Sequence, residues 1–243
     1  MYAQPKFLPA GEMAVSVEFG DAISREVNAR VRALEYLIQQ KVVPGLVETV
    51  PSFRSLLVYY DPLVIGWDAL LENLQSLASQ AEAEGLPPGR LVEIPCCYGG
   101  PLGPDLPAVA QRLGLTEGEV VRLHAGAEHL VYFIGFTPGL PYMIGMPERL
   151  TIPRLETPRQ KTLAGSVGIG GGQCTIYSVE SPGGFWVLGR TPLRLYDPDS
   201  ADPILLRPGD RVRFRVIDEA EFDTIVRAVA AGTFRPQVEE PLR

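Results

Sequence analysis

Three arginines in this sequence stand directly beside turn-forming residues. Arg154 and Arg159 each follow a proline, and Arg190 follows a glycine. A planar guanidinium can bind a carboxylate or a phosphate through two parallel hydrogen bonds, which requires a fixed position. We therefore interpret these arginines as candidates for binding an anion; for each of them, an ordinary surface arginine is the alternative.

A glycine-rich run, AGSVGIGGGQ, occupies residues 164–173. It matches neither the phosphate loop nor the dinucleotide-binding template. Two interpretations remain: backbone amides that hold a developing oxyanion, or a hairpin in which two backbones pack closely. Ser166 is not in a nucleophile elbow. The candidate binding residues here are Gly165, Ser166, Gly170, Gly171, Gly172, Gln173 and Tyr177.

The two histidines, His124 and His129, are the side chains expected to titrate near neutral pH. We take His124 as a candidate general acid or base. A spacing of five residues directs them away from each other on a helix, so we expect no shared metal site. The three cysteines, two of them adjacent, do not suggest a disulfide framework or a metal motif.

The composition excludes several classes of protein. The chain has 243 residues and a formal net charge of −7, with no basic tract, which argues against nucleic-acid binding. No apolar run is long enough to span a membrane, and the first residues lack the pattern of a secretory signal. We expect a cytoplasmic protein in which the cysteines stay reduced.

The hydrophobic pattern predicts an α+β chain of two domains. Residues 1–86 have the order β-α-β-β-α, the first five elements of a ferredoxin-like β-α-β-β-α-β domain. Val27, Val31, Leu34 and Ile38 form the apolar stripe of its first helix, which Asp21 would cap, and residues 91–94 would supply its last strand. Residues 87–243 change to short strands between Gly and Pro turns, typical of a β-barrel, and end in a helix over residues 219–231.

Five motifs occur together and in order in the second half of the chain. They are GFTPGLPY (135–142), IPRLETPR (152–159), AGSVGIGGGQ (164–173), SPGGFWVLGRTP (181–192) and LLRPGDRVRF (205–214). This series resembles the KipI / allophanate hydrolase subunit 1 family, which includes the PxpB-type B subunits of bacterial 5-oxoprolinase. The resemblance covers nearly the whole chain, and it implies that the barrel is cyclophilin-like.

The resemblance also implies an activity that needs other proteins. Family members act with a C-type partner, similar to allophanate hydrolase subunit 2, and with a PxpA-type protein. Together they open 5-oxoproline, a small anionic amide, to glutamate with ATP and its Mg²⁺ counter-ion. The interface with the partner is one place where ATP would bind, and we expect this chain to be inactive alone.

The resemblance leaves two alternative functions open. One is a KipI-like inhibitor of a sensor histidine kinase, and the other is a carboxyltransferase or allophanate hydrolase-type component that acts on a urea-derived amide. The sequence departs from the usual family pattern at His129, Leu140 and Phe185. These changes retain aromatic or apolar bulk, so they bear on substrate choice more than on the fold.

Overall fold

The computed structural model describes residues 1–81, 86 and 89–240. Contacts divide the chain into two compact units, residues 1–88 and 89–243. The domain boundary expected between residues 86 and 87 falls in a stretch where residues 82–85 and 87–88 lie outside the described part. Each unit has its own hydrophobic core.

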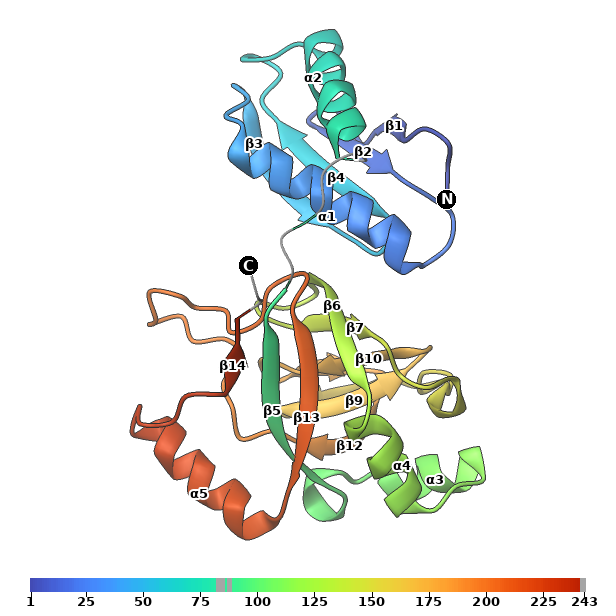
Figure 1. The fold of residues 1–243 in the computed structure, drawn as a ribbon, viewed down its shortest axis with the longest axis vertical. Coiled ribbons are helices and arrows are strands. Elements are labelled where there is room, and N and C mark those ends of the chain that lie inside the picture. Colours follow the sequence, from blue (N-terminus) through green and yellow to red (C-terminus); the bar gives the residue numbers. More distant parts are fainter. Residues whose placement is uncertain (82–85, 87–88, 241–243) are drawn as a thin grey trace. The chain divides into compact units, whose positions relative to one another are not determined.

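The first unit is an antiparallel sheet covered on one face by two helices (Figure 1). Its elements are β1 (Lys6–Pro9), β2 (Ala14–Glu18), α1 (Arg25–Gln40), β3 (Leu46–Pro51), β4 (Ser55–Tyr60) and α2 (Trp67–Gln80). The four apolar positions predicted for the first helix are all buried. Its cap is Ser24 rather than Asp21, because the Ser24 hydroxyl accepts a hydrogen bond from the amide of Val27.

The last strand expected for this sheet belongs to the second unit instead. Residues 91–98 form β5 (Leu91–Tyr98), which pairs in parallel with β13 (Arg211–Ile217). β5 is buried on both faces, whereas a strand of a sheet covered on one side alternates buried and exposed residues. β1 takes the edge beside β2. The ferredoxin-like arrangement is therefore not confirmed, and the chain is mixed α+β with a barrel.

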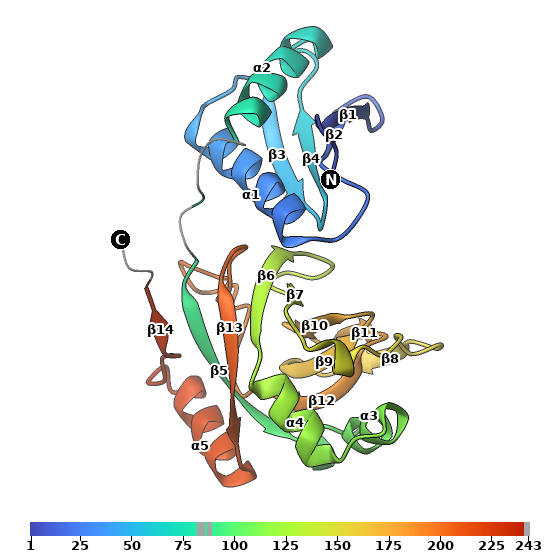
Figure 2. The ribbon, with the colours of Figure 1, turned by 45° about the vertical axis from the view of Figure 1, so that its right-hand side comes forward.

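Seven strands of the second unit close into a barrel in the order β12-β9-β10-β7-β6-β13-β5, because β12 pairs with both β9 and β5 (Figure 2). The other members of the barrel are β6 (Glu128–Ile134), β7 (Pro141–Ile144), β9 (Ser166–Gly170), β10 (Gln173–Ile176) and β12 (Trp186–Arg190). Outside the barrel lie η1 (Gly100–Leu102), α3 (Leu106–Leu113), α4 (Glu117–Ala125), η2 (Glu148–Leu150), β8 (Arg159–Thr162), β11 (Ser181–Gly183), α5 (Glu219–Ala230) and β14 (Val238–Glu239).

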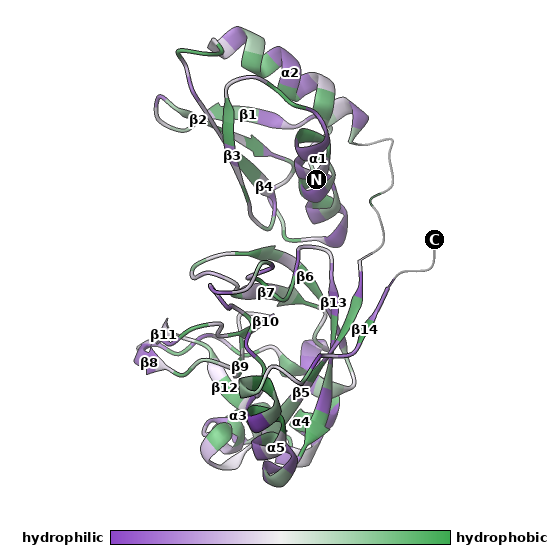
Figure 3. Cartoon of the chain, turned by 90° about the vertical axis from the view of Figure 1, so that its left-hand side faces the viewer, coloured by the Kyte–Doolittle hydropathy of each residue, from purple (hydrophilic) through white to green (hydrophobic). Residues whose placement is uncertain are grey.

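Hydropathy follows this architecture. In Figure 3, β5 is largely hydrophobic, whereas α1 and α2 alternate between hydrophilic and hydrophobic residues, as helices that cover one face of a sheet do. Among the described residues, no helix is both long enough and apolar enough to cross a membrane.

Candidate functional site

A cavity of about 270 Å³ opens on the outer side of the barrel wall formed by β7 and β10. Leu140, Tyr177 and Phe185 form an apolar cluster here, separate from the barrel core. The lining residues are Phe136, Leu140, Tyr142, Arg154, Pro158, Thr175, Tyr177, Pro182, Gly183, Gly184 and Phe185. Two of the residues predicted from the sequence, Arg154 and Tyr177, are among them.

Arg154 is the cation of this cavity. Its guanidinium carbon lies 4.4 Å from the centre of the Phe185 ring, and its Nη2 donates a hydrogen bond of 2.9 Å to Oε1 of Gln173. An aromatic face and a neutral amide fix the position of a guanidinium without neutralising its charge. An exposed arginine held in this way is suited to bind a carboxylate.

Two tyrosines supply hydroxyl groups to the same cavity. Burial raises the pKa of Tyr177 and the pKa of Tyr142 above their usual range, and the charge of Arg154 partly opposes both shifts. Both phenols are therefore neutral at pH 7 and keep a hydrogen to donate. A β-carbon at Gly183 would lie 1.9 Å from Oη of Tyr177, so this position requires a glycine.

The glycine-rich run forms the hairpin between β9 and β10, and three of its amides bond within the fold. The amides of Gly165, Ser166 and Gly171 donate to the carbonyls of Tyr177, Leu163 and Ile152, over 2.7, 3.1 and 2.7 Å. Backbone bonding within the fold has used these donors, so the predicted role is wrong for them.

Three glycines of the run have structural roles. Gly171 and Gly172 form the turn with φ of +62° and +75°, as a two-residue hairpin of this type requires. At Gly170, a β-carbon would lie 3.0 Å from Cγ of Arg154 and 3.4 Å from the Phe185 ring. Gly170 therefore leaves room for the stacked pair.

Arg159 is an ion-pair partner inside the fold rather than an anion-binding residue. Its Nη2 lies 2.5 Å from Oδ1 of Asp105, and Oδ2 of the same carboxylate accepts a hydrogen bond from the amide of Val187 at 2.7 Å. This arrangement ties β8 to the start of α3 and to β12. The carboxylate already balances the arginine charge, which corrects the prediction.

Arg190 lies at a different cavity, of about 330 Å³, that Ser178, Thr191, Arg194 and Asp223 also line. Its Nε donates to the carbonyl of Ala164 at 2.8 Å. The structure therefore does not bring Arg190 together with Arg154.

The side chain of His124 reaches from α4 into the barrel core, where it contacts Cys174 and Phe214, whereas the cavity lies outside the barrel. His124 is fully buried, 3.3 Å from Sγ of Cys174 on β10. Side chains alternate along a strand, and the neighbours of Cys174 in β10, Gln173 and Thr175, face the cavity side. Burial holds the pKa of His124 well below its usual value. The position does not fit an acid or base that acts on a ligand in this cavity.

Several residues of the cavity wall were not among the residues predicted from the sequence. Tyr142 and Phe136 belong to the motif GFTPGLPY, whose turn residues were the signal in the sequence. Phe136 has a φ of +67°, which is unusual outside glycine, and the residue is 66% exposed. Backbone strain and an exposed aromatic ring are features of binding sites.

Residues 5–206 match the family model for the carboxyltransferase domain, subdomain C and D. The chain belongs to this family. Within it, the B subunit of the Bacillus subtilis 5-oxoprolinase is 37% identical over 222 residues, covering 87% of this chain and 92% of that protein. The B subunit of the Escherichia coli O157:H7 5-oxoprolinase is 42% identical over 207 residues, covering 84% of this chain and 92% of that protein.

A solved structure, that of a conserved uncharacterized protein from Pyrococcus horikoshii, is 43% identical, with a TM-score of 0.53. The match covers 89% of this chain and 100% of that chain. The match to the family model and the identity to the two 5-oxoprolinase B subunits confirm the resemblance to the KipI family of PxpB type.

Proposed function

We propose that this chain is the B-type component of a 5-oxoprolinase complex and that its outer cavity binds 5-oxoproline. The observation that carries this proposal is the identity of 37% and 42% to the B subunits of two 5-oxoprolinases, each over more than four-fifths of the chain. The cavity supports it, because it offers one cation among aromatic walls.

5-Oxoproline matches these features chemically. It is a flat five-membered lactam with one carboxylate. Arg154 binds the carboxylate, the ring packs against Phe185 and Leu140, and the hydroxyl of Tyr177 or Tyr142 donates to the lactam oxygen. In this assignment the chain holds and orients the substrate, which is how a protein contributes most to a transfer between bound groups.

ATP supplies the driving force for opening an unstrained lactam, and the amides of Gly165, Ser166 and Gly171 are not available for its phosphates, because they bond to carbonyls within the fold. We therefore assign the binding of ATP and Mg²⁺ to the complex with a C-type partner, similar to allophanate hydrolase subunit 2, and a PxpA-type protein. The chain alone is inactive in this proposal.

The expected compartment is the cytoplasm. The three cysteines are free and buried, as is usual where thiols stay reduced. The cyclophilin-like assignment of the barrel is likewise a proposal, supported by its closure.

The test is reconstitution of the complex from this chain with its C-type and PxpA-type partners. We expect ATP hydrolysis that depends on 5-oxoproline and forms one glutamate for each phosphate released, and no turnover when a partner is omitted. A complex that assembles but ignores 5-oxoproline would contradict the proposal.

A second candidate function, a carboxyltransferase component that acts on a urea-derived amide, is favoured by the family model itself. The same complex distinguishes the two functions. Turnover of a urea-derived amide without turnover of 5-oxoproline supports the carboxyltransferase function.

A further inference from the structure

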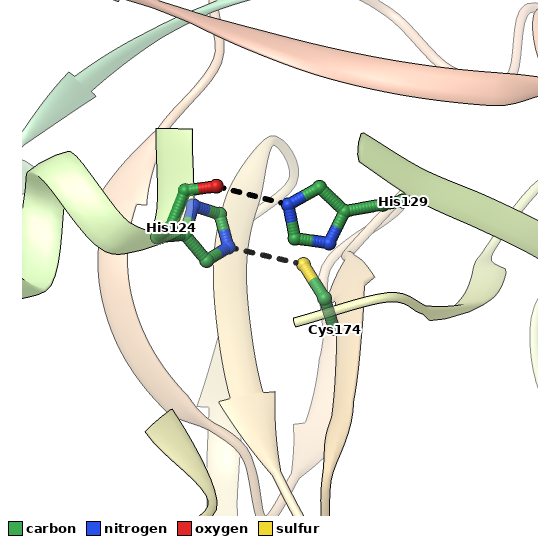
Figure 4. Close-up of side chains that lie close together, drawn as sticks. All are labelled: His124, His129 and Cys174. Carbon is green, nitrogen blue, oxygen red and sulfur yellow. Dashed lines mark hydrogen bonds between the residues drawn. The ribbon is translucent and has the colours of Figure 1, made fainter. Parts of the chain in front are cut away.

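The interior of the barrel holds a cluster that the proposed function does not use. His124, in the last turn of α4, His129 on β6 and Cys174 on β10 each direct one potential ligand atom toward the others (Figure 4). These atoms all lie within 4.8 Å of one another, and the three side chains are fully buried. The expectation that the two histidines turn away from each other is wrong, because it assumed one helix, whereas His129 lies on β6 and its ring centre is 4.9 Å from that of His124.

The hydrogen bonds of His129 show which of its nitrogens faces the cluster. Its Nε2 lies 3.0 Å from the carbonyl oxygen of His124. A carbonyl only accepts, so Nε2 carries the hydrogen, and Nδ1 of the neutral ring carries the lone pair. This Nδ1 is buried and has no hydrogen-bond partner among the described residues. An unpartnered buried lone pair is costly unless something binds it.

His124 has a matching arrangement. Its Nε2 lies 3.3 Å from Sγ of Cys174, and its Nδ1 lies 2.8 Å from Oη of Tyr98. A hydrogen on Nδ1 donated to Tyr98 leaves the lone pair of Nε2 directed at the sulfur. In metal sites, the second nitrogen of a histidine ligand typically makes such a bond to an outer group.

We propose that His124 Nε2, His129 Nδ1 and Cys174 Sγ form a binding site for a borderline-soft divalent ion of the Zn²⁺ class. Imidazole and thiolate are the donors that zinc takes in proteins, at about 2.0–2.1 Å and 2.3 Å. Tetrahedral placement at those lengths puts a nitrogen and a sulfur about 3.5 Å apart, close to the 3.3 Å between His124 and Cys174.

The ion has a structural role at this depth. All three ligands are fully buried, so a substrate does not reach them. Binding would release the thiol proton to solvent and join the end of α4 to β6 and β10. An ion that binds only the folded barrel stabilises it by mass action.

The experiment is metal analysis of the full chain, purified without a metal-affinity tag after growth in zinc-containing medium. We expect about one zinc per chain by mass spectrometry, and a loss of at least about ten-fold in Cys174→Ser and in His129→Phe. Cys97→Ser is the matched control, because Cys97 is a buried cysteine outside the cluster, and it should keep its zinc. Circular dichroism checks that each variant is folded.

Two further measurements do not depend on those variants. Substitution with Co²⁺ should give a cobalt–thiolate charge-transfer band and the intense visible bands of a tetrahedral ion. Tyr98→Phe, which removes only the hydroxyl that positions His124, should weaken zinc binding by roughly ten-fold or more in competition with a chelator. Wild-type protein that takes up less than about 0.1 zinc per chain, even after refolding with excess Zn²⁺, overturns the proposal. Equal zinc in wild type and Cys174→Ser also overturns it.

Discussion

Arg154 and Arg159 belong to one motif, but their surroundings give them different roles. Arg154 is held by a ring and an amide and keeps its charge for a ligand, whereas Arg159 is neutralised by Asp105. The residue type was predictable from the sequence. The partner of each arginine was not, because Asp105 precedes Arg159 by 54 residues and is brought to it only by the fold.

At the same scale, Glu35 on α1 should make the first unit less stable as the pH rises. Burial raises the pKa of this carboxyl to about 7, although Thr49 donates a hydrogen bond to it. The folded state therefore holds the proton more tightly than the unfolded state, so stability is greatest below about pH 4.5 and falls until about pH 7. Glu35→Gln should remove this dependence and stabilise the unit by roughly 2–3 kcal/mol at pH 8.

Urea unfolding followed by the fluorescence of Trp67, in a Trp186→Phe background, measures this effect in the first unit alone. Glu72→Gln, an exposed change on α2, is the control and should keep the pH dependence of the parent. An unchanged slope between pH 5 and pH 8 in Glu35→Gln would show that Glu35 is not the group responsible.

At the scale of elements, β10 separates the two sites of the second unit. Cys174 points into the barrel, whereas Thr175 lines the outer cavity and Gln173 bonds to Arg154 of that cavity, so one short strand contributes to both sites. A sequence of four residues fixes this alternation, yet it does not reveal which side is the interior. For this reason residue types alone suggested His124 and Arg154 for the same reaction, although the barrel wall lies between them.

The sequence predicted individual helices and strands better than it predicted which strands pair with one another. The apolar stripe of α1 was visible in the sequence, because it depends on local periodicity. The membership of β5 was not visible, because a strand buried on both faces fits either unit. Its pairing with β13 joins residues about 120 positions apart, such as Leu91 and Arg211.

The ion pair between β8 and the start of α3 should be important for the stability of the barrel unit. Asp105→Ala leaves the amide of Val187 buried without an acceptor and Arg159 without its partner, so we expect a loss of about 2–4 kcal/mol. Glu180→Ala is the matched control. Glu180 forms an exposed ion pair with Lys161, which lies on β8 like Arg159, and such a pair contributes less than about 1 kcal/mol.

Denaturant unfolding of the two variants, followed by the fluorescence of Trp186, distinguishes these costs. Equal unfolding midpoints for Asp105→Ala and Glu180→Ala would show that the Asp105 contacts do not hold the three elements together.

At the scale of the whole molecule, the cavity that contains Arg154 has the features of a small-anion site, while the amides of Gly165, Ser166 and Gly171 in the glycine-rich run bond within the fold. In the proposed function, this chain binds the substrate and its partners bind the nucleotide of an ATP-driven reaction. This conclusion agrees with the 5-oxoprolinase relatives, which are named as parts of a larger enzyme.

The most direct test of this account is the kcat/KM for 5-oxoproline of the reconstituted complex that carries Arg154→Gln. Loss of a charged hydrogen bond to the substrate carboxylate is worth about 1.5–3 kcal/mol, so we expect a decrease of roughly 10- to 150-fold. Arg149→Gln, a change of an exposed arginine that does not line the cavity, should leave the value within about two-fold of wild type. An Arg154→Gln complex that assembles and turns over 5-oxoproline as efficiently as wild type would contradict the central claim.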